Sequence, residues 1–195
     1  MSVLYCEGIY QPKVDSAEVE CPEYPFSIGE WDTLPIPFLE GRRAPGRKKY
    51  VMVSVGFEGS KTFRVLSRED PDRVSVLFPD PGSEQGYPAI AEEQNKLLIE
   101  TYNVPPAQIV RANAADAIAV WKELSESALE RPESENTYYL SCGTKAHALG
   151  MALRAASLES PCVLYNVPER HNYVPVIPTG RSWLYEIRDL SVLNR

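Results

Sequence analysis

Residues 137–156 read TYYLSCGTKAHALGMALRAA, an apolar run that stops at Cys142-Gly143-Thr144-Lys145 and continues at once as a helix-forming segment. A continuous run of apolar and aromatic residues is typical of a strand that is covered on both faces of a sheet. The segment 145–159 then has the composition and apolar period of a helix. This strand–turn–helix unit favours a sheet in which strands and helices alternate.

The same alternation extends over most of the chain. Apolar runs predict strands at residues 50–55, 73–78, 108–112 and 162–167, and helices are predicted between them at residues 61–69, 88–102 and 114–129. We therefore predict an α/β fold, namely a Rossmann-like, doubly wound and mainly parallel sheet with right-handed crossovers. The tail 174–187 predicts a C-terminal antiparallel hairpin that turns at Pro178-Thr179-Gly180.

Residues 1–49 differ in composition from the rest of the chain. They are rich in proline and aromatic residues, and residues 3–10 (VLYCEGIY) form a candidate short strand. Because disordered tails rarely carry side chains such as Trp31 and Phe38, we expect an extended arm (1–49) on the surface of a Rossmann-like domain (50–195). The basic run at 42–49 is interpreted as a solvated linker, with a ligand or partner surface as the alternative. A protein partner that docks on the arm is a further expectation.

Composition excludes several classes of function. The formal net charge of -7 argues against non-specific binding to duplex DNA or to an anionic membrane. No apolar stretch reaches the length of a membrane span, and the N-terminus lacks the basic start of a signal peptide. The cysteines show no CxxC spacing, and two histidines are too few for a His-based metal centre. We expect a cytoplasmic protein with reduced thiols and with neither metal nor cofactor.

Two loops that follow predicted strands are alike. Gly56-Phe57-Glu58-Gly59-Ser60-Lys61-Thr62 follows the first strand, and Ser141-Cys142-Gly143-Thr144-Lys145 follows the fourth. Ligands of parallel sheets bind beyond the carboxyl ends of the strands, where both loops would lie. Each loop offers glycine, a hydroxyl and a lysine at a helix N-terminus, where free N–H groups and the helix dipole attract anions. The two loops together predict a cradle for phosphate groups.

Simpler interpretations of these residues stay open. Thr144 is also a good helix N-cap, and Gly143 also permits a tight passage from strand to helix. Neither loop has the spacing of a Walker P-loop or of GxGxxG, so a dinucleotide fingerprint is absent. Asp80 follows the second strand and is a candidate for a ribose hydroxyl contact, or else a turn former in its PDPG context.

The stretch YYLSCGTKAHALGMALRAA resembles the fourth-strand motif of CARF domains (CRISPR-associated Rossmann fold), in which a strand runs into a Gly-Thr-Lys turn and a helix rich in small residues. The loop GFEGSK after YVMVSV is similar to the first ligand-binding loop of that family. The resemblance covers about residues 50–187. The chain departs from the usual double glycine by placing Cys142 before Gly143, and the arm has no counterpart in the motif.

The resemblance implies a homodimer that binds a cyclic oligoadenylate across its two-fold axis, in prokaryotic antiviral defence. By motif matching, Ser60 and Lys61 would line the ligand cradle together with Gly143, Thr144 and Lys145. The other candidate ligand-binding residues of the two loops are Gly56, Phe57, Gly59 and Cys142. Some stand-alone members of the family are ring nucleases, which cut the bound ring without a metal. In that case Lys145 would stabilise the developing charge and Ser60 would position the ligand.

Three other residues are weaker candidates. His147, one turn after Thr144, is a candidate ligand donor or a packing residue. Arg170 and His171 follow the fifth predicted strand, on the ligand side of such a sheet. Cys142 is not expected to be a nucleophile, because no base is recognisable near it by spacing.

Three classes of function therefore remain open. The first is a CARF-type sensor of a nucleotide signal, with or without ring cleavage. The second is an enzyme or binding protein for a mononucleotide or dinucleotide held by one protomer. The third is an interaction subunit that keeps the fold without the ligand and docks a partner through the arm.

Overall fold

The chain folds around a six-stranded sheet in the order β2-β7-β6-β3-β4-β5. The computed structural model describes residues 2–10, 27–126, 135–158, 161–171 and 175–188. The parallel strands are β3 (Lys48–Ser54), β4 (Arg73–Pro79), β5 (Ile109–Ala112), β6 (Glu135–Ser141) and β7 (Cys162–His171). The edge strand β2 (Ser27–Pro35) pairs antiparallel with β7. The predicted α/β architecture with a mainly parallel sheet is confirmed.

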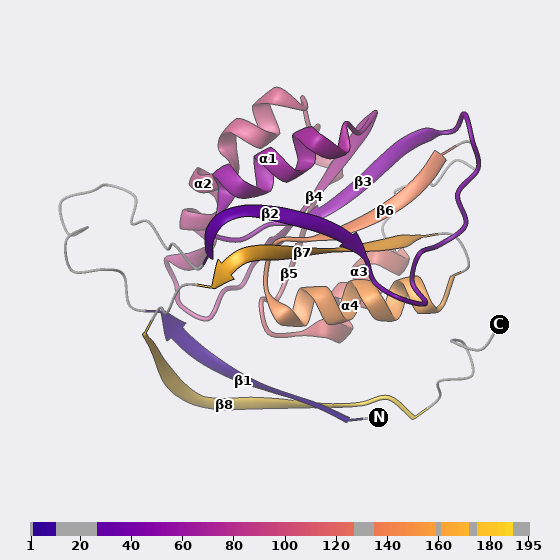
Figure 1. Ribbon diagram of the computed structural model, residues 1–195. Helices are drawn as coiled ribbons and strands as arrows, with labels where there is room; N and C mark the ends of the chain where they lie inside the picture. The colour runs from indigo at the N-terminus through magenta and orange to yellow at the C-terminus, as the bar shows by residue number, and fades with distance from the viewer. Residues whose placement is uncertain (1, 11–26, 127–134, 159–160, 172–174, 189–195) are drawn as a thin grey trace.

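Helices cover both faces of this sheet (Figure 1). On one face lie α1 (Gly59–Glu69) and α2 (Tyr87–Thr101), and on the other lie α3 (Ala117–Glu126) and α4 (Lys145–Ala156). A 3₁₀ turn at Pro106–Gln108 connects α2 to β5. Side chains of β3 alternate between the faces. Val51 and Val53 are in the core cluster that includes Val65 and Leu66 of α1, whereas Tyr50 and Met52 pack with residues of α3 and α4.

The predicted antiparallel pairing of the C-terminal segment is confirmed, but the segment pairs with the N-terminal strand and not with itself as a hairpin. Residues Val176–Glu186 form one strand, β8, which pairs antiparallel with β1 (Ser2–Tyr10) in a separate two-stranded sheet. The sequence Pro178-Thr179-Gly180, which was expected to form a turn, lies opposite a register shift between Cys6 and Gly8 of β1. Gly180 has a φ of 78°. A left-handed glycine in a strand is compatible with such a bulge, so the chain does not need to reverse there.

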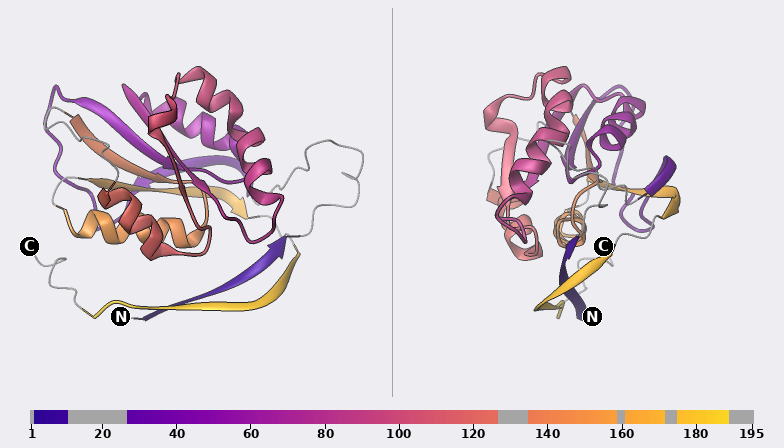
Figure 2. Two further views of the ribbon diagram at one scale, coloured as in Figure 1. Left: turned by 180° about the vertical axis from the view of Figure 1, so that it is seen from behind. Right: turned by 90° about the vertical axis from the view of Figure 1, so that its left-hand side faces the viewer.

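This two-stranded element, hereafter the β1–β8 ribbon, joins the beginning and the end of the described chain beneath α3 and α4 (Figures 1 and 2). The Tyr185 hydroxyl donates to the Ala115 carbonyl and accepts from the Ala117 N–H at the start of α3. Arg181 pairs with Glu7 across the ribbon at 2.6 Å and donates to the Ser83 carbonyl. These contacts hold the ribbon against the loops at the carboxyl edge of the main sheet.

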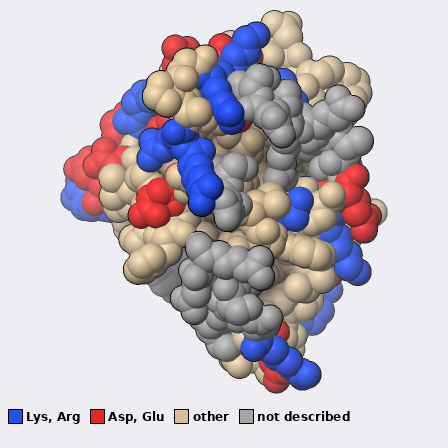
Figure 3. Space-filling model, turned by 90° about the vertical axis from the view of Figure 1, so that its right-hand side faces the viewer, with Lys and Arg blue, Asp and Glu red and all other residues tan. Residues whose placement is uncertain are grey.

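The basic run of the arm lies at the opposite edge. Residues 36–47 connect β2 to the start of β3, so they run along the amino ends of the parallel strands. Figure 3 looks at this side of the molecule, where Lys and Arg side chains stand at the surface beside acidic ones. Within the described residues, no helix combines the length and the apolar character needed to cross a membrane.

Gly59, a predicted ligand residue, has a packing role. A Cβ at this first residue of α1 would overlap the backbone carbonyl of Gln94 in α2. Substitution Gly59→Ala should therefore push α1 away from α2 and destabilise the protein by about 1–3 kcal/mol, measured by urea denaturation. Gly86→Ala is the matched control, because a Cβ there meets nothing within 4 Å. Equal stability of the two variants would contradict this view of the α1–α2 contact.

Candidate functional site

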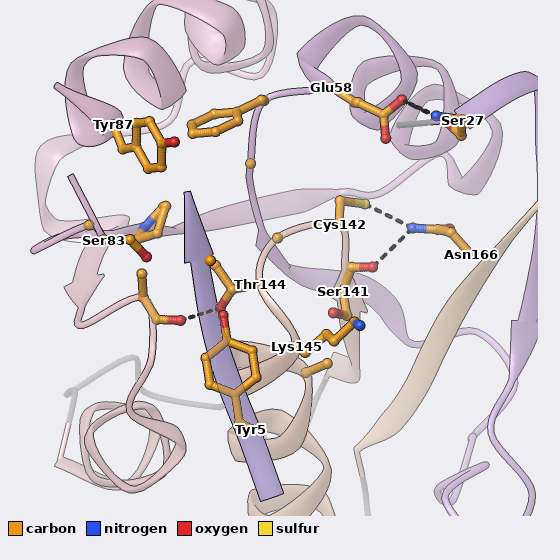
Figure 4. Close-up of a pocket in the computed structure, with 18 of the residues that line it drawn as sticks. Tyr5, Ser27, Glu58, Ser83, Tyr87, Ser141, Cys142, Thr144, Lys145 and Asn166 are labelled. Atoms are coloured by element: carbon orange, nitrogen blue, oxygen red, sulfur yellow. Dashed lines mark hydrogen bonds between the residues drawn. The ribbon is translucent and has the colours of Figure 1, made fainter. Parts of the chain in front are cut away.

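A cavity of about 490 Å³ lies at the carboxyl edge of the parallel strands. Its walls come from the loops that follow β3, β4 and β6, from β2 and β7, and from Tyr5, Cys6, Gly8 and Val176 of the ribbon. Figure 4 shows the lining side chains, with Tyr87 and Ser83 on one side, Glu58, Cys142 and Asn166 on the other, and Tyr5 of the ribbon below Thr144 in this view. The cavity lies where ligands of doubly wound sheets bind.

The turn between β6 and α4 forms the floor of this cavity, and Gly143 makes its position possible. A Cβ on Gly143 would overlap the Ser54 hydroxyl and lie 2.6 Å from the Val55 carbonyl oxygen at the end of β3. The Cys142 N–H donates to the Ser54 carbonyl at 2.9 Å, which holds the turn in this place. Only glycine allows such an approach of two backbones.

Thr144 caps α4 and uses both functions of its hydroxyl. The Oγ1 atom accepts from the His147 N–H at 3.2 Å and donates to the Ala114 carbonyl at 2.6 Å. The cap satisfies one of the free N–H groups of the helix. Because the hydroxyl hydrogen is already used by Ala114, Thr144 serves the site by anchoring the turn to the loop after β5.

Lys145 is the first residue of α4, and its exposed side chain lines the cavity. Among the described residues that line the cavity, it is the sole Lys or Arg, and Glu58 is the sole carboxylate. No described residue forms an ion pair with Lys145. The positive end of the α4 dipole lies at the same place, so the floor of the cavity attracts an anion.

The first glycine loop reaches the cavity only in part. Gly56 and Phe57 line it, and the Phe57 ring meets the Tyr87 ring edge-on with centroids 5.0 Å apart. Ser60 is exposed, and neither it nor Lys61 is among the lining residues. The Lys61 ammonium instead pairs with Glu58 at 3.1 Å and donates to Ser27. The structure thus does not bring the two predicted lysines together.

Three further candidates lie at or outside the rim. Asp80 is not a lining residue and forms an ion pair of 3.1 Å with Arg111. Arg170 and His171 belong to β7 itself, because this strand continues beyond the predicted end to pair with β2. Both side chains are exposed, and of the two only His171 lines the cavity.

His147 is a buried structural residue. Its Nε2 lies 3.3 and 3.2 Å from the carbonyl oxygens of Ala112 and Asn113, so this nitrogen carries the proton, and Nδ1 accepts from the Ser54 hydroxyl at 3.1 Å. Burial lowers the pKa of His147 to about 4, against the smaller opposing effect of the two carbonyls. The neutral imidazole therefore joins β3, α4 and the loop after β5.

Cys142 is also held in place by hydrogen bonds, and its thiol is unreactive. The Asn166 side-chain amide donates to its sulfur at 2.9 Å and to the Ser141 carbonyl at 3.2 Å. Burial raises the pKa of the Cys142 thiol to about 12, and the charge of nearby Glu58 acts in the same direction. Since the thiolate is the reactive form, Cys142 is a wall of the cavity and not a nucleophile.

The part of the cavity formed by the arm and the ribbon could not be predicted from the sequence. Ser27 and Trp31 of β2 and Tyr5 of β1 line it together with Asn166 of β7. The prediction of individual strands does not show which distant segment of the chain will cover the edge of a sheet. Glu58 belongs to the first glycine loop, and a carboxylate three residues before Lys61 is the sign in the sequence that this lysine is paired.

No family model matches the chain, and no match was found among the curated proteins, so the interpretation of the cavity rests on its own geometry.

Loss of the Thr144 hydroxyl should weaken the fold. Thr144→Ala removes the N-cap of α4 and leaves the Ala114 carbonyl without its donor, so we expect a loss of about 1–2 kcal/mol in unfolding free energy. Thr144→Ser keeps both hydrogen bonds and should stay near wild type in chemical denaturation. An Ala variant as stable as the Ser variant would show that the hydroxyl does not anchor the turn.

His147 should make stability depend on pH. Its pKa is about 4 in the folded state against 6.5 unperturbed, so the unfolded chain binds the extra proton between these values. Stability should therefore fall as pH drops from 6.5 toward 4, by up to about 1.4 kcal/mol per pH unit. Denaturation curves of His171→Asn, which changes the exposed histidine, should keep this dependence. An NMR titration that gives His147 an ordinary pKa would overturn the assignment.

Proposed function

We propose that the protein binds a nucleotide in the cavity at the carboxyl edge of its sheet, with a phosphate group at the N-terminus of α4. The observation that carries the proposal is Lys145, a lysine without an ion-pair partner among the described residues, placed on the first turn of a helix that opens into the cavity. A phosphate there would receive a charge-assisted hydrogen bond from Nζ as well as the field of the helix.

The opposite end of the cavity favours a planar, weakly polar group. Phe57 and Tyr87 form an edge-to-face pair there, and Tyr5 of the ribbon is a further aromatic residue that lines the cavity. Aromatic side chains stack on the flat face of any nucleobase, so stacking does not depend on the identity of the base. A cavity of about 490 Å³ is within the range of small-molecule sites. One phosphate-binding end and one aromatic end match the two ends of a nucleotide.

The single cation limits the charge of the ligand. Lys61 is neutralised by Glu58, and Arg111 is paired with Asp80 and Glu92, so among the described residues a chain of phosphates would meet Lys145 and the helix dipole as its positive groups. We therefore propose one phosphate per protomer. A mononucleotide fits this description, and so does one unit of a cyclic oligoadenylate, the ligand that the resemblance to CARF domains suggests. The cyclic ligand would require a second copy of the chain, with the two α4 N-termini facing it across a two-fold axis.

The proposal is limited to binding. Ser60, the positioning group that the resemblance implies for ring cleavage, is outside the cavity, and Thr144 has its hydrogen bonded to Ala114. The decisive experiment is calorimetric titration with nucleoside monophosphates and with linear and cyclic oligoadenylates, combined with light scattering and with chromatography of the recovered ligand. A mononucleotide ligand leaves the oligomeric state unchanged, whereas a cyclic ligand should be bound by a dimer. Failure of all these compounds to bind would favour the interaction-subunit class.

Replacement of Lys145 should weaken binding of whichever nucleotide the titrations identify. Lys145→Ala removes a charged hydrogen bond worth about 1.5–3 kcal/mol, which is a ten- to hundredfold rise in Kd. Lys122→Ala is the matched control, because Lys122 is also exposed and lies on α3, outside the cavity. The same Kd for Lys145→Ala and wild type would refute the phosphate position.

A further inference from the structure

The Lys61 cluster is the part of the predicted phosphate cradle that the proposed function leaves unused. It ties the edge strand β2 to the start of α1. The Lys61 ammonium contacts the Ser27 carbonyl, the Ser27 hydroxyl at 2.6 Å and the Glu58 carboxylate at 3.1 Å. The Trp31 indole N–H also donates to the Ser27 hydroxyl, at 2.7 Å. Every member of the cluster therefore has a fixed position.

Glu58 is bound in this cluster through one oxygen only. Its Oε1 atom accepts from the Ser27 N–H at 3.1 Å, from the Ser27 hydroxyl at 2.7 Å and from Lys61 at 3.1 Å. Its Oε2 atom has no hydrogen-bond donor among the described residues. Figure 4 shows one oxygen joined to Ser27 and the other directed toward the space beside Cys142. The Glu58 side chain is 13% exposed and lines the cavity, so the open oxygen is directed into the binding space.

An ionised carboxylate can only accept hydrogen bonds. Three donors already hold Oε1, and the Lys61 charge offsets the cost of placing the carboxylate in a half-enclosed site. The second oxygen is consequently a preorganised acceptor that requires a donor from the ligand. A phosphate would be repelled there, which separates this subsite from the one at Lys145.

Glu58 lies on the side of the cavity away from Tyr87 and Ser83 (Figure 4), and its neighbours indicate which ligand group it meets. Glu58 follows Phe57 of the aromatic end directly in the chain. On its other side lies Cys142, whose thiol senses the Glu58 charge and which immediately precedes Gly143 in the turn that starts α4. In a nucleotide, the sugar lies between the base and the phosphate, and its hydroxyl groups are donors.

We propose that Glu58 accepts a hydrogen bond from a ribose hydroxyl of the nucleotide, and that Ser27 and Lys61 are positioning residues that hold its carboxylate. This inference rests on the proposed function and adds selection of ribose over deoxyribose. Asp80, the sequence-based candidate for this contact, is paired with Arg111, and Glu58 takes its place. Lys61 then acts on the sugar subsite through Glu58 and does not touch phosphate.

The test compares AMP with 2′-deoxy-AMP and 3′-deoxy-AMP by calorimetric titration. Wild type should bind AMP about ten- to hundredfold more tightly than at least one deoxy form, because a hydrogen bond to a charged acceptor is lost. Glu58→Gln keeps the shape of the side chain and should bring this preference close to one, while Lys145→Ala should weaken all three nucleotides and leave the preference intact. A wild-type protein that binds the three nucleotides equally refutes the ribose inference and leaves the proposed function standing. Failure of all three to bind counts against both.

The positioning role of Lys61 is tested by a quantity that does not depend on the stability of the variant, namely the preference for AMP over its deoxy forms. Lys61→Met should reduce the preference for AMP over its deoxy forms, since the carboxylate loses its charged donor, and Lys61→Arg should restore it. The preference is a ratio within one variant, so partial unfolding does not change it. Lys96→Met, on the exposed surface of α2, is the control and should keep the wild-type ratio. A Lys61→Met protein with the full wild-type preference would remove Lys61 from the site.

Discussion

The contact between Gly143 and the end of β3 is the constraint on which the candidate site depends. Because no side chain fits between the β6–α4 turn and the residues Ser54 and Val55, the turn lies directly on the neighbouring strand. Helix α4 starts immediately after this contact, so its N-terminus opens at the centre of the carboxyl edge. Thr144 and His147 then bind the loop after β5, which fixes the direction of the helix. A larger residue at 143 would displace the turn, and with it the helix start and Lys145.

Most of the main sheet could be predicted from the sequence because its strands are buried on both faces and read as continuous apolar runs. The segment 50–55 is an example, since its apolar residues alternate between two core clusters and its one polar residue, Ser54, is itself buried. The errors fall where a strand has a partner far away in sequence. Nothing local in residues 174–187 distinguishes a hairpin from a strand that pairs with residues 2–10, and Pro178-Thr179-Gly180 is compatible with both a turn and a bulge. The pairing of β2 with β7 is of the same kind.

Only the part of the candidate site at the start of α4 could be predicted from the sequence, because hydrogen-bond partners from distant segments determine the rest. Sequence shows that Thr144 and Lys145 begin a helix after a strand, and this places them at the cavity. It does not show which polar groups are already used. Lys61 has the same context as Lys145 in the sequence, yet Glu58 and Ser27 occupy its ammonium, and Ser27 comes from the arm. The functions of Gly59 and His147 are likewise determined by neighbours from other elements, namely the Gln94 carbonyl and Ser54.

The β1–β8 ribbon has a consequence for the order of events during synthesis. One wall of the cavity includes Tyr5, Cys6 and Gly8, which are synthesised well before their partner strand Val176–Glu186. The Rossmann-like layers can form from local strand–helix units as the chain grows, whereas the ribbon requires a pairing such as Ser2 with Glu186. The wall to which Tyr5 belongs can therefore take its place only after β8 has been made. Ligand binding in the complete cavity thus requires that synthesis has passed Glu186.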